Sequence, residues 1–336
     1  MTAANADNMA LRVSGLRVDF RTDRGRVVVV DDVSFSLAQG ETLAIVGESG
    51  SGKSVTAMSI MGLLDPSARV SGEIRFEGED LLRLSEPEKD AIRGKSIAMI
   101  FQEPMTSLNP VFTVGEQIAE VGRIHKGLSG PEGRQFAIDM LRLVGISAPE
   151  RRVDEYPHQL SGGMVQRVMI AIGLACNPRL LIADEPTTAL DVTIQAQILD
   201  LLDRLVKETG SSLLLITHDF GVVAQMADKV IVMYCGRIVE RADVRSLFDR
   251  PQHPYTRALM RSMPSLASRD EPLVAIEGNV PPPYDLPSGC RFRTRCPHAR
   301  RICAEREPPA NRAGPTHEVS CWMGTDAYAG SGTESR

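Results

Sequence analysis

One octet constrains this chain more than any other segment: residues 47–54, with the sequence GESGSGKS. An apolar run, Glu41 to Val46, precedes it, and a helix-like stretch, Ser54 to Leu64, follows it. The octet fits the pattern G-x-x-x-x-G-K-[ST], in which glycines let backbone N–H groups surround phosphate oxygens. Strand, glycine-rich loop and helix in this order predict a binding site for a nucleoside triphosphate.

The residues that the octet pattern specifies have expected roles. Lys53 is expected to reach the β- and γ-phosphates of the nucleotide, and the Ser54 hydroxyl is expected to bind Mg²⁺. The remaining candidates for nucleotide contacts are Gly47, Ser49, Gly50, Ser51, Gly52 and Val55. A glycine- and serine-rich turn that matches by chance is the alternative, but the flanking strand and helix argue against it.

A second group of candidate catalytic residues ends another apolar segment. Residues 180–183 are apolar, and Asp184 and Glu185 follow them directly. Asp184 is predicted to hold Mg²⁺, and Glu185 is predicted to polarise an attacking water molecule. Two acidic residues at a strand end also suit a solvated turn, but a phosphate loop in the same chain favours the catalytic interpretation.

Buried-strand candidates alternate with helical patterns along the chain. The expected strands cover residues 11–20, 26–33, 97–101, 180–183, 212–217 and 229–233. Helical periodicity over 195–207, between two of these strands, predicts an α/β fold with a parallel central sheet. From about residue 103 to 165 the pattern is mostly helical, which predicts an inserted helical subdomain. After Pro251, frequent prolines predict a separate, loop-rich extension.

Charge and hydropathy exclude two classes of protein. The net charge is −5 with dispersed Lys and Arg residues, so we expect no nucleic-acid partner. The first ten residues lack a basic region followed by an apolar run, and no apolar run approaches the ~18 residues that a membrane-spanning helix needs. We therefore expect a cytoplasmic protein. If it works at a membrane, other subunits must span that membrane.

The most specific motif is Leu160-Ser161-Gly162-Gly163-Met164, followed by Gln166 and Arg167. It resembles the signature motif of ABC ATPases. In that family the signature serine and glycines lie at a helix N-terminus and bind the γ-phosphate of ATP held by the opposite subunit. The resemblance implies that Ser161, Gly162 and Gly163 act in trans, within a dimer. The family's commonest last signature residue is Gln, and Met164 in its place indicates a subgroup.

Further residues match functional positions of the ABC family. Gln102 matches the Q-loop glutamine, which senses Mg²⁺ and the γ-phosphate, and His218 matches the switch histidine that contacts the γ-phosphate. Asp191 ends a segment, 189–191, that matches the D-loop, which couples the two active sites of the dimer. Phe20 lies where the family stacks an aromatic ring on adenine, although a core role suits it nearly as well.

Longer motifs point to one branch of the family. The signature segment 160–164, the segment 184–197 and the segment 253–259 resemble the ATPases of oligopeptide, dipeptide and nickel importers, specifically the first of their two paired ATPase subunits. The resemblance covers about residues 11–322. It implies a core with a RecA-like sheet, an antiparallel β subdomain and the helical subdomain. On this basis we expect a nucleotide-binding domain over 10–252, an extension over 253–325 and a disordered tail over 326–336.

The same resemblance implies an assembly and a reaction. ATP hydrolysis by this subunit would power import, together with a second ATPase subunit, identical or paralogous, two membrane permeases and an extracytoplasmic solute-binding protein. The place of action would be the cytoplasmic face of the bacterial inner membrane, and the solute a di- or oligopeptide, nickel or another small solute.

Two other classes of protein remain as alternatives. One is a soluble ABC ATPase, although this chain has one cassette and no long coiled-coil insertion, and the other is an iron–sulfur redox protein with a regulatory ATPase.

Four of the six cysteines fall in the last part of the chain: Cys290, Cys296, Cys303 and Cys321. Without an export signal they are better explained as metal ligands or reduced thiols than as disulfides. Four thiolates suit Zn²⁺ or an iron–sulfur cluster. The short spacing of zinc ribbons is absent and arginines surround the cysteines, and some members of the resembled family carry a [4Fe–4S] cluster here. We therefore expect a [4Fe–4S] cluster, with zinc or unligated thiols as alternatives.

Overall fold

The computed structural model describes residues 8–23, 25–188, 190–263 and 276–332. They form two compact units, and each unit is described by itself. Unit 1 comprises Met1–Leu11, Leu37–Thr42 and Phe76–Ile216, and unit 2 comprises Arg12–Ser36, Leu43–Arg75 and Thr217–Arg336. Within the described residues, no helix combines the length and apolar character that a membrane crossing requires.

Unit 1 is built on three parallel strands, β6 (Ile97–Ile100), β7 (Leu180–Asp184) and β8 (Ser212–Thr217). They lie in the order β8-β7-β6, and every residue of β7 and β8 is buried. Strands that are buried on both faces read as continuous apolar runs, which is why the sequence predicted them well. Because β7 ends at Asp184, the following acidic residue emerges at the carboxyl edge of this sheet.

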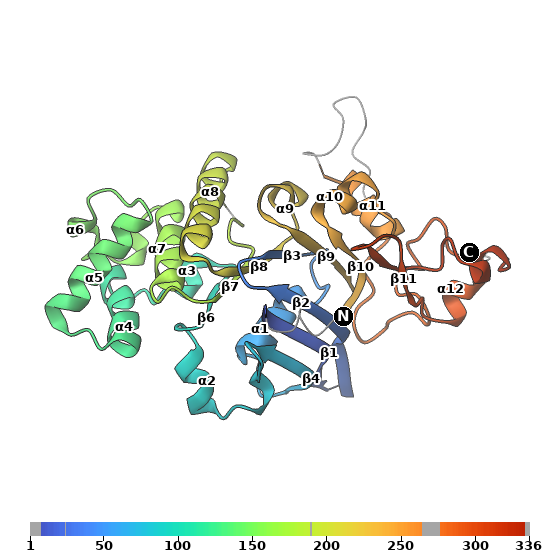
Figure 1. The fold of residues 1–336 in the computed structure, drawn as a ribbon, viewed down its shortest axis with the longest axis horizontal. Helices are drawn as coiled ribbons and strands as arrows, with labels where there is room; N and C mark the ends of the chain where they lie inside the picture. The colour runs from blue at the N-terminus through green and yellow to red at the C-terminus, as the bar shows by residue number, and fades with distance from the viewer. Residues whose placement is uncertain (1–7, 24, 189, 264–275, 333–336) are drawn as a thin grey trace. The chain divides into compact units, whose positions relative to one another are not determined.

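Helices make up most of the remainder of unit 1. Before β6 lie β5 (Glu79–Asp80), a 3-10 turn (Leu81–Arg83) and α2 (Glu86–Ile92). Between β6 and β7 lie α3 (Pro104–Ser107), α4 (Val114–Lys126), α5 (Gly130–Leu143), α6 (Pro149–Arg152), a 3-10 turn (Pro157–Gln159) and α7 (Gly162–Leu174). Figure 1 shows α4, α5, α6 and α7 grouped together in green. Helices α4, α5 and α6 lie within the segment of about 103–165 that we expected to be helical, and α7 extends beyond it to Leu174.

Helix starts in this unit follow from local capping. The Thr113 hydroxyl accepts the Glu116 N–H, and the Glu116 carboxylate accepts the Thr113 N–H, which together cap α4. After β7, α8 (Val192–Thr209) begins behind Asp191, whose side chain accepts the Ile194 N–H at 3.0 Å. Helix α8 ends at Gly210 in a left-handed conformation, a common way to stop a helix.

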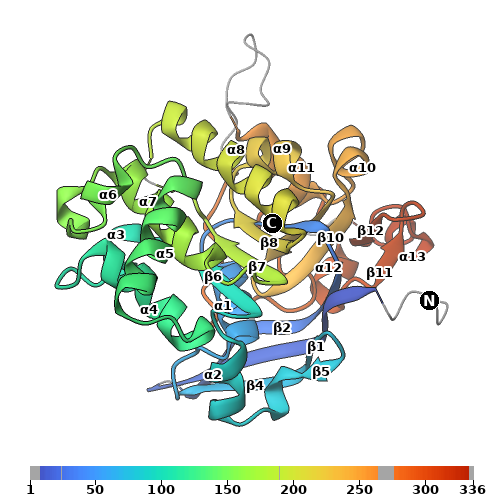
Figure 2. The ribbon, with the colours of Figure 1, turned by 60° about the vertical axis from the view of Figure 1, so that its left-hand side comes forward.

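Unit 2 contains two sheets. In one, β2 (Gly25–Ala38), β1 (Met9–Thr22) and β4 (Ala68–Phe76) lie in that order, shown in blue shades in Figure 2. In the other, β3 (Thr42–Val46) pairs in parallel with β9 (Lys229–Tyr234), and β9 pairs antiparallel with β10 (Arg237–Asp243). The octet joins β3 to α1 (Lys53–Met61), so the predicted order of strand, loop and helix is confirmed.

The C-terminal part of unit 2 extends that second sheet. Strand β12 (Glu318–Ser320) pairs antiparallel with β10, and β11 (Ala310–Arg312) pairs antiparallel with β12. Helices fill the connections: α9 (Phe220–Met226), α10 (Val244–Asp249), α11 (Pro254–Arg261), α12 (Arg301–Glu305) and α13 (Asp326–Ala329). One hydrophobic core includes Val46 of β3 and Val232 of β9 together with Tyr255 and Phe292.

Two sequence expectations change here. The segment expected as a separate extension contributes strands and buried aromatic rings to the sheet and core of unit 2, because its prolines interrupt helices without preventing burial. The segment expected as a disordered tail begins with α13, which Thr325 caps by accepting the Tyr328 N–H. Residues 333–336 of that tail lie outside the described residues. The proposed boundary at residues 252 and 253 stays a prediction.

Candidate functional site

The phosphate loop of unit 2 has a backbone that only glycine allows at two positions. Gly47 has φ 157°, and a Cβ placed there would lie 2.3 Å from the Met233 carbonyl oxygen. Gly52 has φ 99° and immediately precedes α1. The first turn of a helix leaves backbone N–H groups without intrahelical acceptors, so the loop and the start of α1 together form a cradle for an anion.

Polar side chains of the loop are held close to this cradle. Lys53 is 5% exposed, and its ammonium group donates to the carbonyl oxygens of Gly47 at 2.8 Å and Glu48 at 3.1 Å. The Ser51 hydroxyl is buried and has no hydrogen-bond partner among the described residues. A buried hydroxyl without a partner costs free energy, so it fits a site that an anionic ligand completes. Ser54 and Val55 are half-buried at the start of α1.

Glu48 contacts two residues from distant parts of unit 2. Its N–H donates to the Tyr255 hydroxyl at 2.8 Å. Its carboxylate accepts two hydrogen bonds from the Arg295 guanidinium, at 2.7 and 3.0 Å. The turn after β9 supports the loop at a second point, because the Gly236 N–H donates to the Ser51 carbonyl oxygen at 2.9 Å.

In unit 1, the structure brings two predicted catalytic residues together. The Glu185 carboxylate accepts a hydrogen bond from the Gln102 amide at 3.1 Å and another from the Thr188 hydroxyl at 2.9 Å. Glu185 has φ 47°, and its N–H donates to the Ile216 carbonyl oxygen at 2.8 Å. A non-glycine residue in the left-handed region is a feature of functional sites. Asp184, the preceding residue, is buried at the end of β7.

The signature segment lies at the start of α7, also in unit 1. Ser161 is the N-cap, and its hydroxyl accepts the Met164 N–H at 3.4 Å. Ser161 and Gly162 are exposed, and a Cβ at Gly163 would lie 2.8 Å from a methyl carbon of Ile194 in α8. The signature helix therefore starts at the surface of unit 1 and packs closely against α8.

The remaining predicted residues are placed as follows. Asp191 is exposed and caps α8, and Ala189 of the same predicted D-loop lies outside the described residues. His218 is exposed and follows β8, and Phe20 is half-buried near the end of β1. Lys53, Ser54, Phe20 and His218 belong to unit 2, whereas Gln102, Ser161, Asp184, Glu185 and Asp191 belong to unit 1.

The four C-terminal cysteines line one small cavity in unit 2. Cys290, Cys296, Cys303 and Cys321 share its wall with His253, Phe292, His298 and Trp322. Burial, and then the neighbouring thiols, raise the pKa of Cys290 to about 12. Within the described residues, none of the four is joined in a disulfide bond. In the part of the chain that the structure describes, however, no group of three or more His, Cys, Asp or Glu side chains is arranged to hold a metal ion. The expected cluster therefore stays a prediction.

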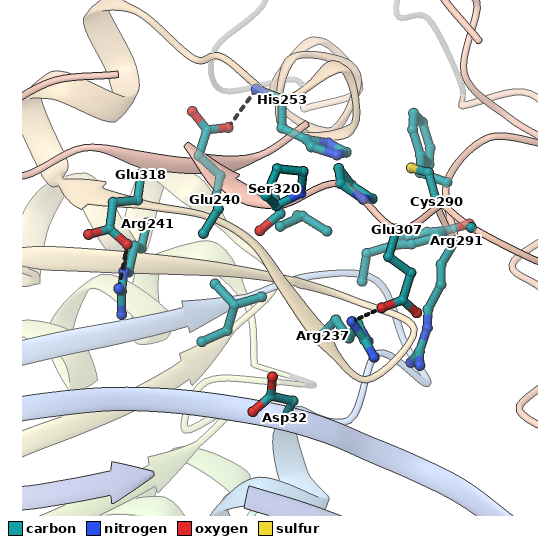
Figure 3. Close-up of a pocket in the computed structure, with 18 of the residues that line it drawn as sticks. Asp32, Arg237, Glu240, Arg241, His253, Cys290, Arg291, Glu307, Glu318 and Ser320 are labelled. Carbon is teal, nitrogen blue, oxygen red and sulfur yellow. Dashed lines mark hydrogen bonds and ion pairs between the residues drawn. The ribbon is translucent and has the colours of Figure 1, made fainter. Parts of the chain in front are cut away.

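A larger pocket, of about 370 Å³, lies beside these cysteines and is drawn in Figure 3. Cys290 and Arg291 form part of its wall. Its charged side chains are largely paired with each other: Arg237 with Glu307, and Arg241 with Glu318. The pocket is therefore polar but nearly neutral.

Sequence analysis missed the residues around Glu48. The octet pattern leaves its second position unspecified, so nothing marked Glu48 as a contact point. Tyr255 lies within segment 253–259, whose resemblance to peptide-importer ATPases was a usable signal. Arg295 is one of the arginines among the cysteines, and no local pattern links it to a residue 247 positions away.

Comparisons with known proteins agree with this geometry. A family model described as "ABC transporter" matches residues 30–188, and one described as "Oligopeptide/dipeptide transporter, C-terminal region" matches residues 239–303. A structure of a dimeric ATP-binding cassette in a post-hydrolysis state, bound to ADP and Pi, superposes with a TM-score of 0.63 at 30% identity, covering 70% of this chain and 99% of the other. The ABC cassette fold predicted from the motifs is confirmed.

Proteins named for oligopeptide and dipeptide transport match nearly the whole chain. The oligopeptide transport ATP-binding protein AppD of Bacillus subtilis is 52% identical, covering 93% of this chain and 96% of AppD. The dipeptide transport ATP-binding protein DppD of Escherichia coli is 51% identical, covering 93% of this chain and 95% of DppD. The chain therefore belongs to the family of ATP-binding proteins of oligopeptide and dipeptide ABC transporters.

Proposed function

We propose that this ABC-type ATPase powers the import of di- or oligopeptides. The observation that carries the proposal is the match along almost the entire length, at about half identity, to proteins named for oligopeptide and dipeptide transport. The match includes the C-terminal region that gives its name to a separate family model. A soluble, non-transport ABC ATPase has no such support.

The phosphate loop supplies the binding chemistry for ATP. Lys53 binds the β- and γ-phosphates, for which it exchanges its bonds to the Gly47 and Glu48 carbonyl oxygens. Backbone N–H groups of the loop and of the first turn of α1 bind the phosphate oxygens. Ser54, Asp184 and Gln102 are the proposed magnesium ligands, and the ion neutralises phosphate charge. Phe20 is the proposed contact for adenine.

Glu185 supports the attack of water on the γ-phosphate. Its carboxylate is held by Gln102 and Thr188, so its oxygens are oriented by two donors. A carboxylate at this position accepts a hydrogen bond from the attacking water and orients it. His218 is the proposed contact to the γ-phosphate. Because Gln102 is also a proposed magnesium ligand, the Gln102–Glu185 hydrogen bond links the metal site to the water.

A second subunit completes the site. The exposed residues Ser161 and Gly162, at the positive end of α7, are proposed to bind the γ-phosphate of ATP held by the opposite subunit. Asp191, at the start of α8, is proposed to couple the two sites. Dimeric structures among the similar ATP-binding cassettes support this arrangement. Closure of the dimer on two ATP molecules, and its reopening after hydrolysis, then drive the transport cycle.

The assembly follows from the importer proposal. The partners are a second ATPase subunit, identical or paralogous, two membrane permeases and an extracytoplasmic binding protein. The subunit works at the cytoplasmic face of the membrane, where ATP is available. The solute is a peptide, because the named relatives handle oligopeptides and dipeptides, and nickel or another small solute is the alternative outcome of an uptake assay.

The Glu185→Gln variant tests the mechanism. We expect ATP binding to persist and hydrolysis to fall by about 10²–10⁴-fold, because a general-base carboxylate is lost. Size-exclusion chromatography with ATP and Mg²⁺ is expected to show a stable closed dimer. The matched control is Glu208→Gln, which removes an exposed carboxylate of α8. Normal hydrolysis by Glu185→Gln would overturn the assignment of this residue.

The cysteine cavity supports a separate proposal about a cofactor. Four thiols that share one cavity form the donor set of a [4Fe–4S] cluster, although the described residues are not arranged as a metal site. Cys290, Cys296, Cys303 and Cys321 would hold the cluster, and zinc is the alternative. Iron and zinc analysis of anaerobically purified protein, with the quadruple Cys→Ser variant as control, decides between them. Stoichiometric zinc without iron would refute the iron–sulfur proposal.

A further inference from the structure

An acidic residue lies inside a loop that binds a polyanion. Glu48 is the second residue of the phosphate loop, and its peptide is fixed on both sides. The Tyr255 hydroxyl accepts its N–H, and Lys53 donates to its carbonyl oxygen. The Glu48 carboxylate carries the same sign of charge as the phosphates, so some group must compensate it if the loop is to bind ATP tightly.

Arg295 is that compensating group. Its guanidinium makes two hydrogen bonds to the Glu48 carboxylate, at 2.7 and 3.0 Å, which is the strong, bidentate geometry. The Arg295 side chain is 3% exposed and that of Glu48 is 25% exposed. Burial acts to lower the pKa of Arg295, but the interactions with Glu48 and Tyr234 together outweigh it, and the pKa is raised overall. The pair is therefore largely shielded from water, so removal of one partner leaves an uncompensated charge and costs more than the loss of a surface ion pair.

Arg295 is itself held in place by the C-terminal segment. Its Nε donates to the Glu277 carbonyl oxygen at 3.1 Å, and its guanidinium lies over the rings of Tyr234 and Phe292. Phe292 contacts Tyr234 and Tyr255, with ring centroids 5.2 and 5.4 Å apart. The orientation of the guanidinium thus depends on an aromatic cluster rather than on a flexible surface.

The short segment 290–296, which contains Arg295, also lines part of the cysteine cavity. Residues 290–296 contain Cys290 and Cys296, and Phe292 lines the cavity with them. Phe292 therefore has one side toward the cysteines and another toward Tyr255, which binds the phosphate loop. A change at the cysteines that moves this segment also moves Arg295.

We propose that Arg295 is a positioning residue for ATP binding: it neutralises Glu48 and fixes the phosphate loop, and it thereby makes nucleotide affinity depend on the cysteine-bearing segment 290–296. This inference rests on the proposed function, because it assumes that the loop binds ATP. It adds a role for the C-terminal region in the nucleotide site of its own chain.

The charge argument predicts an unusual pattern in a double-mutant cycle. Arg295→Ala leaves an uncompensated carboxylate beside the phosphates, and we expect the affinity for ATP to fall by about tenfold or more. Glu48→Gln removes the charge itself, so its effect is expected to stay within about threefold. The double variant, Glu48→Gln with Arg295→Ala, is expected to bind ATP within about threefold of the wild type, because no unpaired charge remains. A purely structural role for Arg295 predicts no such rescue.

ATP itself is the probe, and displacement of a fluorescent ATP analogue from the purified full-length chain measures its affinity. Arg300→Ala is the matched control. Arg300 lies four residues after segment 290–296 and donates to the Tyr328 carbonyl oxygen at 2.7 Å, but it makes no described contact with the phosphate loop. Arg300→Ala is expected to change ATP affinity by less than about twofold. If Arg295→Ala does not fold, Arg295→Lys replaces it, because lysine keeps the charge and loses the bidentate geometry.

The outcomes separate this inference from the proposed function. Wild-type affinity in Arg295→Ala, or a double variant as weak as Arg295→Ala alone, would overturn the role of Arg295. Lys53→Ala serves as the test of the loop itself. If Lys53→Ala also bound ATP normally, the assignment of the nucleotide site would fail, whereas loss of binding in Lys53→Ala with none in Arg295→Ala would refute only the present inference.

Coupling to the cysteines has its own test. A Cys290→Ser, Cys296→Ser variant is expected to weaken ATP binding by several-fold, which is less than for Arg295→Ala because the guanidinium is displaced rather than removed. In the Glu48→Gln background the same two substitutions are expected to have no further effect on ATP affinity. An equal loss in both backgrounds would show that the cysteines do not act through the Arg295–Glu48 pair, and would overturn that part of the proposal.

Discussion

His253 makes the stability of unit 2 depend on pH. This residue is 1% exposed, and burial, followed by the positive charge of Arg257, lowers the pKa of its imidazole to about 3. Its Nδ1 accepts the Tyr255 N–H at 3.1 Å, so the neutral ring caps α11. The backbone N–H of His253 donates to the buried Glu240 carboxylate at 2.9 Å. Protonation in the folded state would place a positive charge on a buried ring near Arg257, and the fold needs this ring as a hydrogen-bond acceptor.

The free-energy change follows from the two pKa values. The folded pKa lies below the ordinary value of 6.5, so the unfolded chain binds the proton first as the pH falls. Stability is therefore full above about pH 6.5 and decreases as the pH falls below it. From neutral pH to about pH 5, the expected loss from this one group is about 2 kcal/mol, since RT ln(1 + 10^1.5) is about 2 kcal/mol. Because pH 5 lies above the folded pKa, nearly all of this change comes from protonation of the unfolded chain.

Urea unfolding followed by Trp322 fluorescence measures this effect. The chain has one tryptophan, and it lines the cysteine cavity together with His253. A loss of about 2 kcal/mol lowers the urea midpoint by roughly 1 M if the slope is near 2 kcal/mol/M. The test variant is His253→Asn, whose side-chain oxygen keeps an acceptor for the cap without a titrating ring. We expect its midpoint to change much less between neutral pH and about pH 5 than that of the wild type.

The comparison between pH values is the readout, because His253→Asn also changes packing and so lowers stability at every pH. His158→Asn is the control, since it removes an exposed histidine of unit 1. It is expected to retain the wild-type pH dependence. If His253→Asn lost as much stability on acidification as the wild type does, the neutral, buried state of His253 would not be the source of the pH dependence.

Two further predictions concern residues whose contacts are equally well defined. Glu240 is 1% exposed, and its carboxylate accepts hydrogen bonds from Gln252 N–H, His253 N–H and His317 Nε2. Glu240→Ala is therefore expected to lower the free energy of unfolding by about 3–5 kcal/mol, measured by the same urea assay. Glu307→Ala, which removes a half-exposed partner of Arg237, is its control and is expected to cost less than about 1 kcal/mol. In Gly47→Ala the new Cβ would lie 2.3 Å from the Met233 carbonyl oxygen, so ATP affinity is expected to fall more than about tenfold. Gly40→Ala is the control, because Gly40 also has a positive φ but a Cβ there would meet no atom within 4 Å. Equal losses of ATP affinity in both variants would contradict the steric argument.

The elements that the sequence predicted well are those with a strong local signal. β8 was expected at residues 212–217 and has those bounds, because six buried residues in a row leave no alternative face. α8 extends the expected helix by a few residues at each end, since Asp191 caps its start and Gly210 ends it. The pairing of Gln102 with Glu185 was not predicted as a contact, although both residues were assigned to the site.

The C-terminal region shows what local patterns leave open. Frequent prolines and cysteines predicted loops, and they did not reveal that Tyr255 and Phe292 enter the core around β3 and β9. Cysteine spacing identified a donor set, and the structure shows that the four side chains share a cavity. Spacing alone does not fix how thiols are oriented. Long-range packing, rather than propensity, decides each of these features.

Glu48 illustrates why the motif and the loop are not equivalent. The phosphate-loop pattern specifies the glycines, Lys53 and Ser54, because these residues determine the backbone path and the phosphate contacts. An acidic residue at an unspecified position leaves that path unchanged but adds a negative charge, which makes the loop dependent on a cation from elsewhere. Arg295 supplies the cation, and the core that holds it includes Val46, the residue directly before the loop. Removing the C-terminal region would therefore not leave a shorter ATPase, because it would expose both a charge and an apolar surface at the nucleotide site.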